Sequence, residues 1–170
     1  MPKSPLWGRS RHSKILNVLR KGIILEQVEK AFKLSKKIGL ETLAYFMIGS
    51  PTETKEDILE TIRFAKKINP DFTHITITTP FPSTDLYRMG LEQKIWPNDY
   101  WQEFAKHPHA DFVPSAWEKI LTKEELVLLV QKAYRAFYFR PKYLLRRLLK
   151  LTSFEELKTK SKAALQLLKI

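Results

Sequence analysis

Two short segments of the chain contain residues that could bind a ligand. In residues 45–54, an apolar stretch ends at Gly49 and is followed closely by Glu53. Glycine lets a backbone approach a ligand closely, and a helix that begins after this turn would offer free backbone N–H groups. In residues 77–87, two prolines within three positions fix the loop. Both segments are also compatible with ordinary connections between a strand and a helix.

The remaining chemical groups point to neither a catalytic nor a metal site. The chain has no cysteine, so its own residues form no disulfide, supply no thiolate nucleophile and ligate no iron–sulfur cluster through cysteine. His107 and His109 have a spacing that could chelate a metal, but Asp111 is the only acid close to them. The acids of residues 53–60 crowd the expected start of a helix, where they complement its dipole. We therefore expect no catalytic residue and no metal ligand.

The elements around the two segments predict an α/β fold. The nearly continuous apolar run of residues 42–48 predicts a strand that is buried on both faces, as in a parallel sheet. Thr54 is a candidate N-cap for an amphipathic helix over residues 54–68, and residues 72–79 predict a second strand. A strand, a helix and a strand in this order predict a βαβ unit with parallel strands. Two strands suggest either a fragment of a larger α/β fold or a sheet whose edges are covered by the C-terminal helices.

Four regions are expected along the chain. Residues 1–12 form a leader without periodicity, which we expect to be disordered, and residues 13–93 contain the α/β part. Residues 94–121 are rich in tryptophan and proline, which predicts an ordered irregular excursion over the strand ends. Residues 122–170 form a basic helical tail. The helices expected outside the βαβ unit are 13–21, 25–37, 84–93, 122–139, 142–150 and one that begins at Ser153.

Charge is distributed unevenly over the 170 residues. Lysine and arginine number 30 against 18 acidic residues, which gives a formal net charge of +12. Residues 1–40 and 121–170 are basic, whereas residues 41–120 are slightly acidic. This charge alone predicts weak, salt-sensitive association with polyanions. The longest apolar run is too short to cross a bilayer and no secretory signal is recognisable, so a cytoplasmic location is expected.

The basic tail permits two interpretations. Aromatic residues and cations alternate in residues 134–150, a pattern that could bind a nucleic acid strand or an anionic membrane. Alternatively, the aromatic side chains pack on the core and the basic stems lie outside. In the second case Arg146, Arg147 and Lys150 would be exposed and would contribute little to stability. We favour the second interpretation.

Taken together, residues 15–92 resemble radical S-adenosylmethionine enzymes. The likeness is greatest to the large group that is associated with a cobalamin-binding domain and includes the anaerobic magnesium-protoporphyrin ester cyclases. Residues 49–54 resemble the family's Gly-x-Pro-x-Glu-Thr pattern at the end of the fifth strand, and residues 79–84 resemble the elbow after the sixth. Ser83 stands where the family usually has glycine. The resemblance implies an α/β fragment of a partial (βα)6 TIM-like barrel, namely its last two parallel strands with their helices, plus a C-terminal helical extension.

The same resemblance implies a cofactor site. S-adenosylmethionine would place its adenine at Met47 and Gly49, with Thr79 and Pro80 nearby and Glu53 as a further candidate. A [4Fe-4S] cluster and cobalamin also belong to the family, but the Cys-x3-Cys-x2-Cys motif that holds the cluster has no counterpart here.

We therefore expect a truncated or split radical S-adenosylmethionine protein that is inactive alone. A subunit or an upstream polypeptide would carry the missing half of the barrel. The alternative is a non-catalytic basic interaction module that binds lipid, nucleic acid or a partner subunit.

Overall fold

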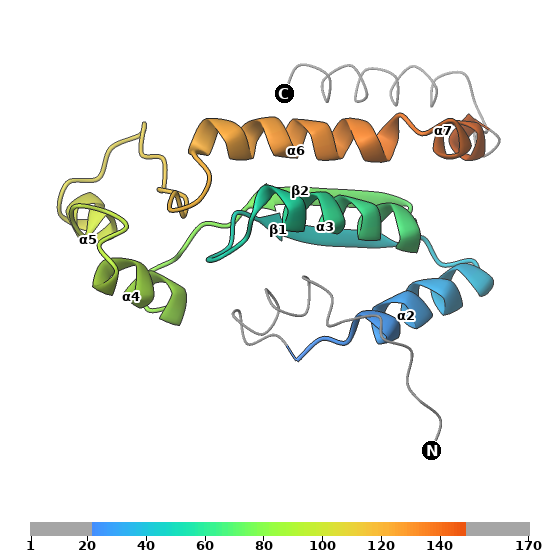
Figure 1. Ribbon diagram of the computed structural model, residues 1–170, viewed down its shortest axis with the longest axis horizontal. Helices are drawn as coiled ribbons and strands as arrows, with labels where there is room; N and C mark the ends of the chain where they lie inside the picture. The colour runs from blue at the N-terminus through green and yellow to red at the C-terminus, as the bar shows by residue number, and fades with distance from the viewer. Residues whose placement is uncertain (1–21, 149–170) are drawn as a thin grey trace.

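A computed structural model describes residues 22–148 of the chain. Within this range it contains two strands and six helices, shown in Figure 1: α2 (Leu25–Lys37), β1 (Leu43–Ile48), α3 (Lys55–Ile68), β2 (Phe72–Ile77), α4 (Asp85–Glu92), α5 (Tyr100–Lys106), α6 (Lys123–Tyr138) and α7 (Pro141–Leu148). The expected leader, the helix at 13–21 and the helix from Ser153 lie outside the described residues. None of the helices within 22–148 is long and apolar enough to cross a membrane.

The centre of the fold is the βαβ unit that the sequence predicts. Strands β1 and β2 are parallel and pair in register from Leu43 opposite Phe72 to Ile48 opposite Ile77. Helix α3 connects them and begins at a capping box, in which the Thr54 hydroxyl accepts a hydrogen bond from the Asp57 N–H. The α/β class and the parallel pairing are thus confirmed.

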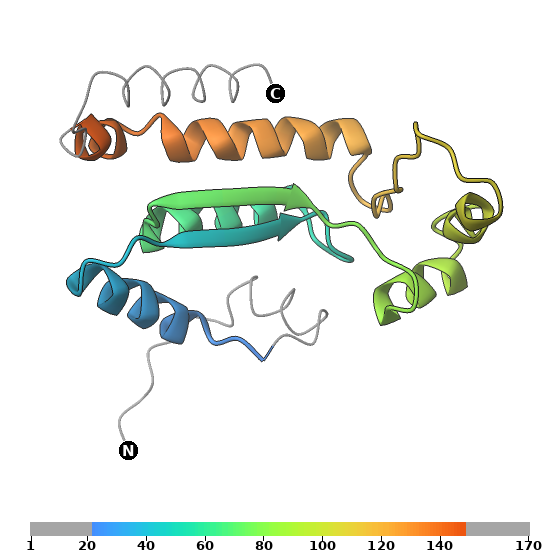
Figure 2. The same cartoon turned by 180° about the vertical axis from the view of Figure 1, so that it is seen from behind.

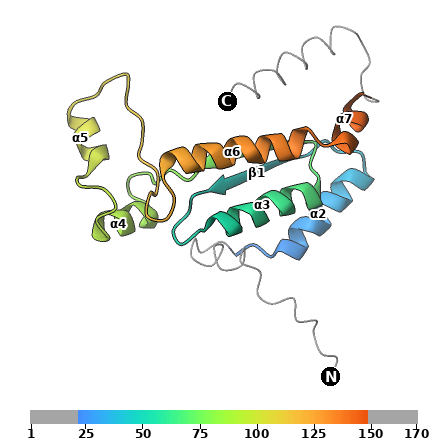
Figure 3. The ribbon, with the colours of Figure 1, turned by 45° about the horizontal axis from the view of Figure 1, so that its top comes forward.

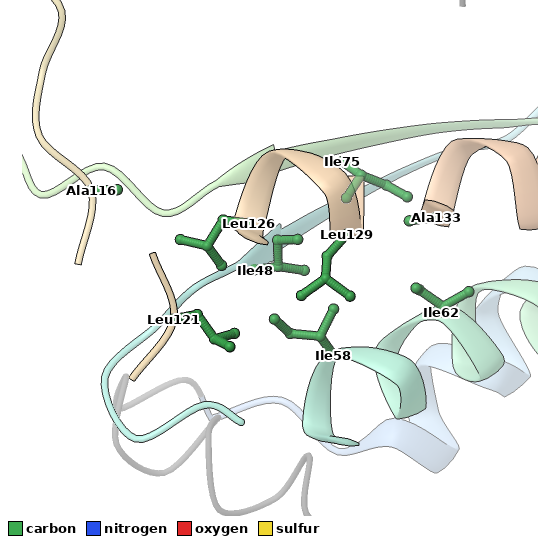
Figure 4. Packing of buried hydrophobic residues seen from close by; sticks show 9 residues of the cluster. All are labelled: Ile48, Ile58, Ile62, Ile75, Ala116, Leu121, Leu126, Leu129 and Ala133. Carbon is green, nitrogen blue, oxygen red and sulfur yellow. The ribbon is translucent and has the colours of Figure 1, made fainter. Parts of the chain in front are cut away.

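Helices α3 and α6 cover the same face of the sheet (Figure 3). Their apolar side chains meet those of the strands in one cluster between the helices and the sheet (Figure 4). Four of its members have no exposed surface at all, namely Ile48, Ile58, Leu126 and Ala133. The full cluster is Ile48, Ile58, Ile62, Ile75, Ala116, Leu121, Leu126, Leu129 and Ala133.

The opposite face of the sheet is not covered by the described residues except at Phe72, where Arg147 lies over the ring, which corrects the expectation of burial on both faces. We call it the open face, and it carries Leu43, Tyr45, Met47, Phe72 and His74. Tyr45 is 72% exposed and Met47 is 48% exposed. Figure 2, which shows the molecule from behind, has the strands in front of α3 with no described helix across them. The apolar run of residues 42–48 therefore places apolar side chains on an exposed face. Parallel sheets are normally buried on both faces, so this face is of the kind that another element covers.

The region after β2 is ordered by aromatic packing. It contains α5, a helix that the sequence did not predict within residues 94–121. Trp96 stacks on Tyr87 with ring centres 5.5 Å apart and meets Trp117 edge-on. The indole N–H of Trp101 donates to the Pro80 carbonyl over 3.0 Å, which attaches this region to the end of β2.

The tail packs on the core through its aromatic residues, as favoured from the sequence. Phe137 and Tyr143 are buried. The expectation that Arg146 and Arg147 lie outside is wrong, because their side chains are only 28% and 14% exposed. Both donate hydrogen bonds to the backbone carbonyls that precede β2. Lys150 lies outside the described residues.

Candidate functional site

The carboxyl ends of β1 and β2 lie side by side and are joined by hydrogen bonds. The N–H of Thr78 donates to the Ile48 carbonyl over 2.7 Å, which continues the ladder past the end of β2. The hydroxyls of Ser50 and Thr78 are both buried and lie 3.1 Å apart. The two loops that follow the strands are therefore held together at one edge of the sheet.

The buried side chain of Glu53 bonds back to the backbone of its own loop after β1. Its carboxylate accepts a hydrogen bond from the Ser50 N–H over 2.9 Å, and its side chain is only 3% exposed. Burial raises the pKa of the Glu53 carboxyl from its usual 4.5 to about 7, while hydrogen bonds from the N–H groups of Ser50 and Gly49 act in the opposite direction. Glu53 is therefore placed to hold the loop in shape.

Backbone conformation explains some of the residue types in these loops. Gly49 has a φ of 80°, and a Cβ at this position would lie 2.9 Å from the Leu126 side chain. Glycine is therefore required both by the backbone and by the packing of α6. Thr52 and Ser83 also have positive φ, 65° and 63°. Ser83 thus keeps the left-handed conformation that suits glycine, the residue usual at this place in the family that the sequence resembles.

The other predicted residues lie around the same edge. Met47 points from β1 onto the open face, and Gly49 follows it in the loop. The Thr79 hydroxyl is 3.4 Å from the Ile77 carbonyl, and Pro80 is fully buried. The structure thus gathers all five predicted residues at the carboxyl edge of the sheet, but only Met47 among them presents an exposed side chain.

Two features of this region were missed by the sequence reasoning, a pair of buried hydroxyls and a pocket. The first is the pair of buried hydroxyls of Ser50 and Thr78. The position of both residues just after the strand ends was the signal in the sequence that could have revealed it. A pocket of about 470 Å³ lies between α4 and α5, with Pro82, Thr84 and Trp101 in its walls. It depends on α5 and therefore had no signal in the sequence. Within residues 22–148, no three acidic or histidine side chains come together as metal ligands.

Comparisons with known proteins identify relatives of the chain. It is 36% identical over 137 residues to an uncharacterized methyltransferase of Pyrococcus horikoshii. It is 30% identical over 131 residues to the anaerobic magnesium-protoporphyrin IX monomethyl ester cyclase of Rubrivivax gelatinosus. It is also 37% identical over 78 residues to the tRNA-2-methylthio-N(6)-dimethylallyladenosine synthase of Buchnera aphidicola. No protein-family model matches the chain.

The matches cover much of this chain but little of the relatives. They span 81%, 76% and 45% of the 170 residues, in the same order. They span only 29%, 22% and 18% of the three relatives. The chain therefore corresponds to less than a third of each of these proteins.

Proposed function

The chain is a relative of the radical S-adenosylmethionine proteins, and we propose that it forms the last two strand–helix units of their cofactor-binding barrel. In this proposal residues 43–93 are one wall of a partial (βα)6 barrel, and the remaining wall comes from residues outside these 170. The relatives are named for different reactions, so the proposal stops at binding of S-adenosylmethionine and selects no substrate.

The open face of the sheet is the observation that supports this proposal. In a barrel of parallel strands, helices cover the outside and alternate side chains point to the inside. Here α3 and α6 cover one face, while Tyr45 and Met47 point from the other. The open face would then be the interior of the barrel, and the site would lie at its carboxyl end, where ligands bind in folds of this class.

The residues at this end fit one part of the cofactor. The Met47 side chain and the Gly49 backbone would border the adenine, with Thr79 and Pro80 beside them. Glu53 would fix the loop that presents Gly49. Bound S-adenosylmethionine would supply radical chemistry only when an iron–sulfur cluster delivers an electron. No residue of this chain can hold that cluster through cysteine, so these 170 residues alone should not cleave the cofactor, and we assign no residue to cobalamin.

Titration of the full chain with S-adenosylmethionine, followed by amide NMR shifts, tests the proposal. We expect saturable shifts confined to residues 47–53 and 76–81, with a dissociation constant on the order of 1 mM because one wall of the site is present. Adenosine should shift the same amides, since only the adenine end of the cofactor is held here.

Two variants serve as a matched pair for this titration. Met47→Asp, at the proposed adenine contact, should weaken binding at least about tenfold, because it places a charge against an apolar ring. Leu128→Asp introduces the same charge at an exposed position of α6 and should leave binding unchanged. Shifts that are absent at saturating cofactor, or that fall elsewhere in the chain, would contradict the proposal.

In the described part of the tail, up to residue 148, several cations are engaged in contacts within the chain, which does not favour the alternative of a basic interaction module. Arg140 donates to the Lys66 carbonyl over 3.1 Å, and Arg147 lies 4.2 Å from the centre of the Phe72 ring. These cations are thus used in packing within the described residues. Weak association with polyanions stays a prediction from the net charge.

A further inference from the structure

The two outer edges of the sheet differ in their hydrogen bonding. On the β2 edge, the Tyr138 hydroxyl accepts from the Thr73 N–H over 3.0 Å and donates to the Thr73 carbonyl over 2.9 Å. The Tyr134 hydroxyl does the same for Ile75, at 3.0 and 3.2 Å. Each phenol therefore satisfies both backbone groups of one strand residue. We call Tyr134 and Tyr138 the tyrosine pair.

The geometry of α6 makes this arrangement possible. Four residues of an α-helix rise about 6 Å, and alternate residues of a strand are about 6.6 Å apart. Side chains four positions apart on α6 therefore match the repeat of backbone groups along β2. Because both outward-facing residues in the middle of β2 are already paired, this edge offers little to another strand.

The β1 edge has no such cover among the described residues. The carbonyls of Thr42 and Ile48 accept hydrogen bonds from the β2 side. Alternation along a strand then directs the N–H and C=O groups of Leu43, Tyr45 and Met47 to the other side. Within residues 22–148 the sheet has two strands, so no third strand lies beside this edge.

The unpaired β1 edge and the open face are continuous, because the three residues of the edge also contribute their side chains to the face. Tyr45 and Met47 present exposed side chains to the face and backbone groups to the edge. On the face, the rings of Tyr45 and His74 meet edge-on with centres 5.6 Å apart. A surface of this kind combines an apolar patch with a row of backbone groups that can pair.

We propose that the β1 edge and the open face form one docking surface for a parallel β-strand and its neighbours, which belong to the polypeptide that completes the barrel. The tyrosine pair confines strand pairing to this side of the sheet. The inference rests on the proposed function and adds to it the place and direction of assembly.

The physical requirements of the sheet favour this occupant over a second copy of the chain. A symmetric dimer would pair β1 with its own copy in the antiparallel sense and would leave the open face bare. Parallel sheets are instead covered on both faces, which calls for a partner with several elements. The chain spans only 29% of the Pyrococcus horikoshii relative, so the rest of such a protein is long enough to provide them.

Amide hydrogen exchange of the full chain tests the inference, with the unmatched part of the Pyrococcus horikoshii relative as the probe. In the free chain, the Thr73 and Ile75 amides should exchange at least about tenfold more slowly than those of Tyr45 and Met47. Addition of the probe should slow Tyr45 and Met47 at least about tenfold.

Two variants separate the two edges. Tyr45→Asp, on the exposed face, should abolish the effect of the probe and leave Thr73 and Ile75 protected. The double variant Tyr134→Phe, Tyr138→Phe should expose these two amides and keep the response of β1 to the probe. Tyr45→Asp keeps the test decisive if the double variant does not fold.

Three results would overturn the inference: Tyr45 and Met47 amides that are protected in the free chain, protection of these two amides that grows with the chain's own concentration, or no protection of them by the probe. The cofactor titration described above is read separately. Shifts with S-adenosylmethionine but no β1 protection would refute the docking surface alone. Protection of β1 without cofactor shifts would refute the adenine site alone.

Discussion

Replacing Glu53 by glutamine should change how the stability of the chain depends on pH. The carboxyl is buried, and its pKa of about 7 lies well above the usual 4.5. In the unfolded chain it loses its proton near pH 4.5, whereas in the folded chain it keeps the proton to about pH 7. Between these values the folded state binds more protons, so its stability falls as the pH rises. The difference between the two pKa values corresponds to about 3 kcal/mol.

Urea unfolding of the full chain at several pH values between 4.5 and 8, followed by tryptophan fluorescence, measures this effect. Glutamine has nearly the same shape as a protonated glutamate and stays neutral throughout. The free energy of unfolding of Glu53→Gln minus that of the wild type should therefore rise by about 3 kcal/mol across this range. Glu56→Gln, which removes an exposed carboxyl from the first turn of α3, is the matched control. A Glu53 difference that stays within about 0.5 kcal/mol at all pH values would refute burial of a protonated carboxyl.

Three further predictions concern stability and are checked by the same unfolding measurement at constant pH. Gly49→Ala should destabilise the chain by about 1 to 3 kcal/mol, because it strains a positive φ and forces a Cβ against a buried side chain of α6. Arg147→Gln should cost about 1 to 3 kcal/mol through its lost hydrogen bond to the Asp71 carbonyl, whereas Arg88→Gln at an exposed site should cost less than about 1 kcal/mol. Thr52→Gly should stabilise the chain by up to about 1 kcal/mol, since a β-branched residue is strained at a φ of 65°; unchanged or lower stability would contradict this reasoning.

Local signals were sufficient to predict the βαβ unit and the family. The N-cap residues Thr54 and Thr122 and the apolar spacing placed α3 and α6 to within a residue or two. The parallel pairing followed because a helix separates the two strands. The pattern at residues 49–54 led to the radical S-adenosylmethionine proteins, which the relatives confirm. All of these features depend on residues that are close together in the sequence.

Features that depend on distant contacts were not predictable in this way. The apolar pattern of β1 could not show that one of its faces lacks a cover within the described residues. Arg147 looked like a solvated cation because its partners are far from it in the sequence. Its guanidinium bonds to Glu41, which is 106 positions away, and lies over the ring of Phe72. The orientation of Glu53 was equally hidden, since a carboxylate at a loop can point to a ligand or back to its own backbone. Only the tertiary structure decides between these cases.

Helix α6 determines how the sheet can grow. Leu126, Leu129 and Ala133 form one stripe that packs into the core. Tyr134 and Tyr138 form a second stripe beside it, about 100° further round the helix, and this stripe binds the edge of β2. Because both stripes belong to one rigid helix, the packing of the core sets the position of the hydroxyls along the strand. Among the described residues, α6 therefore closes the β2 edge and leaves β1 as the edge from which the sheet could extend, which is the arrangement that the proposed wall of an incomplete barrel requires.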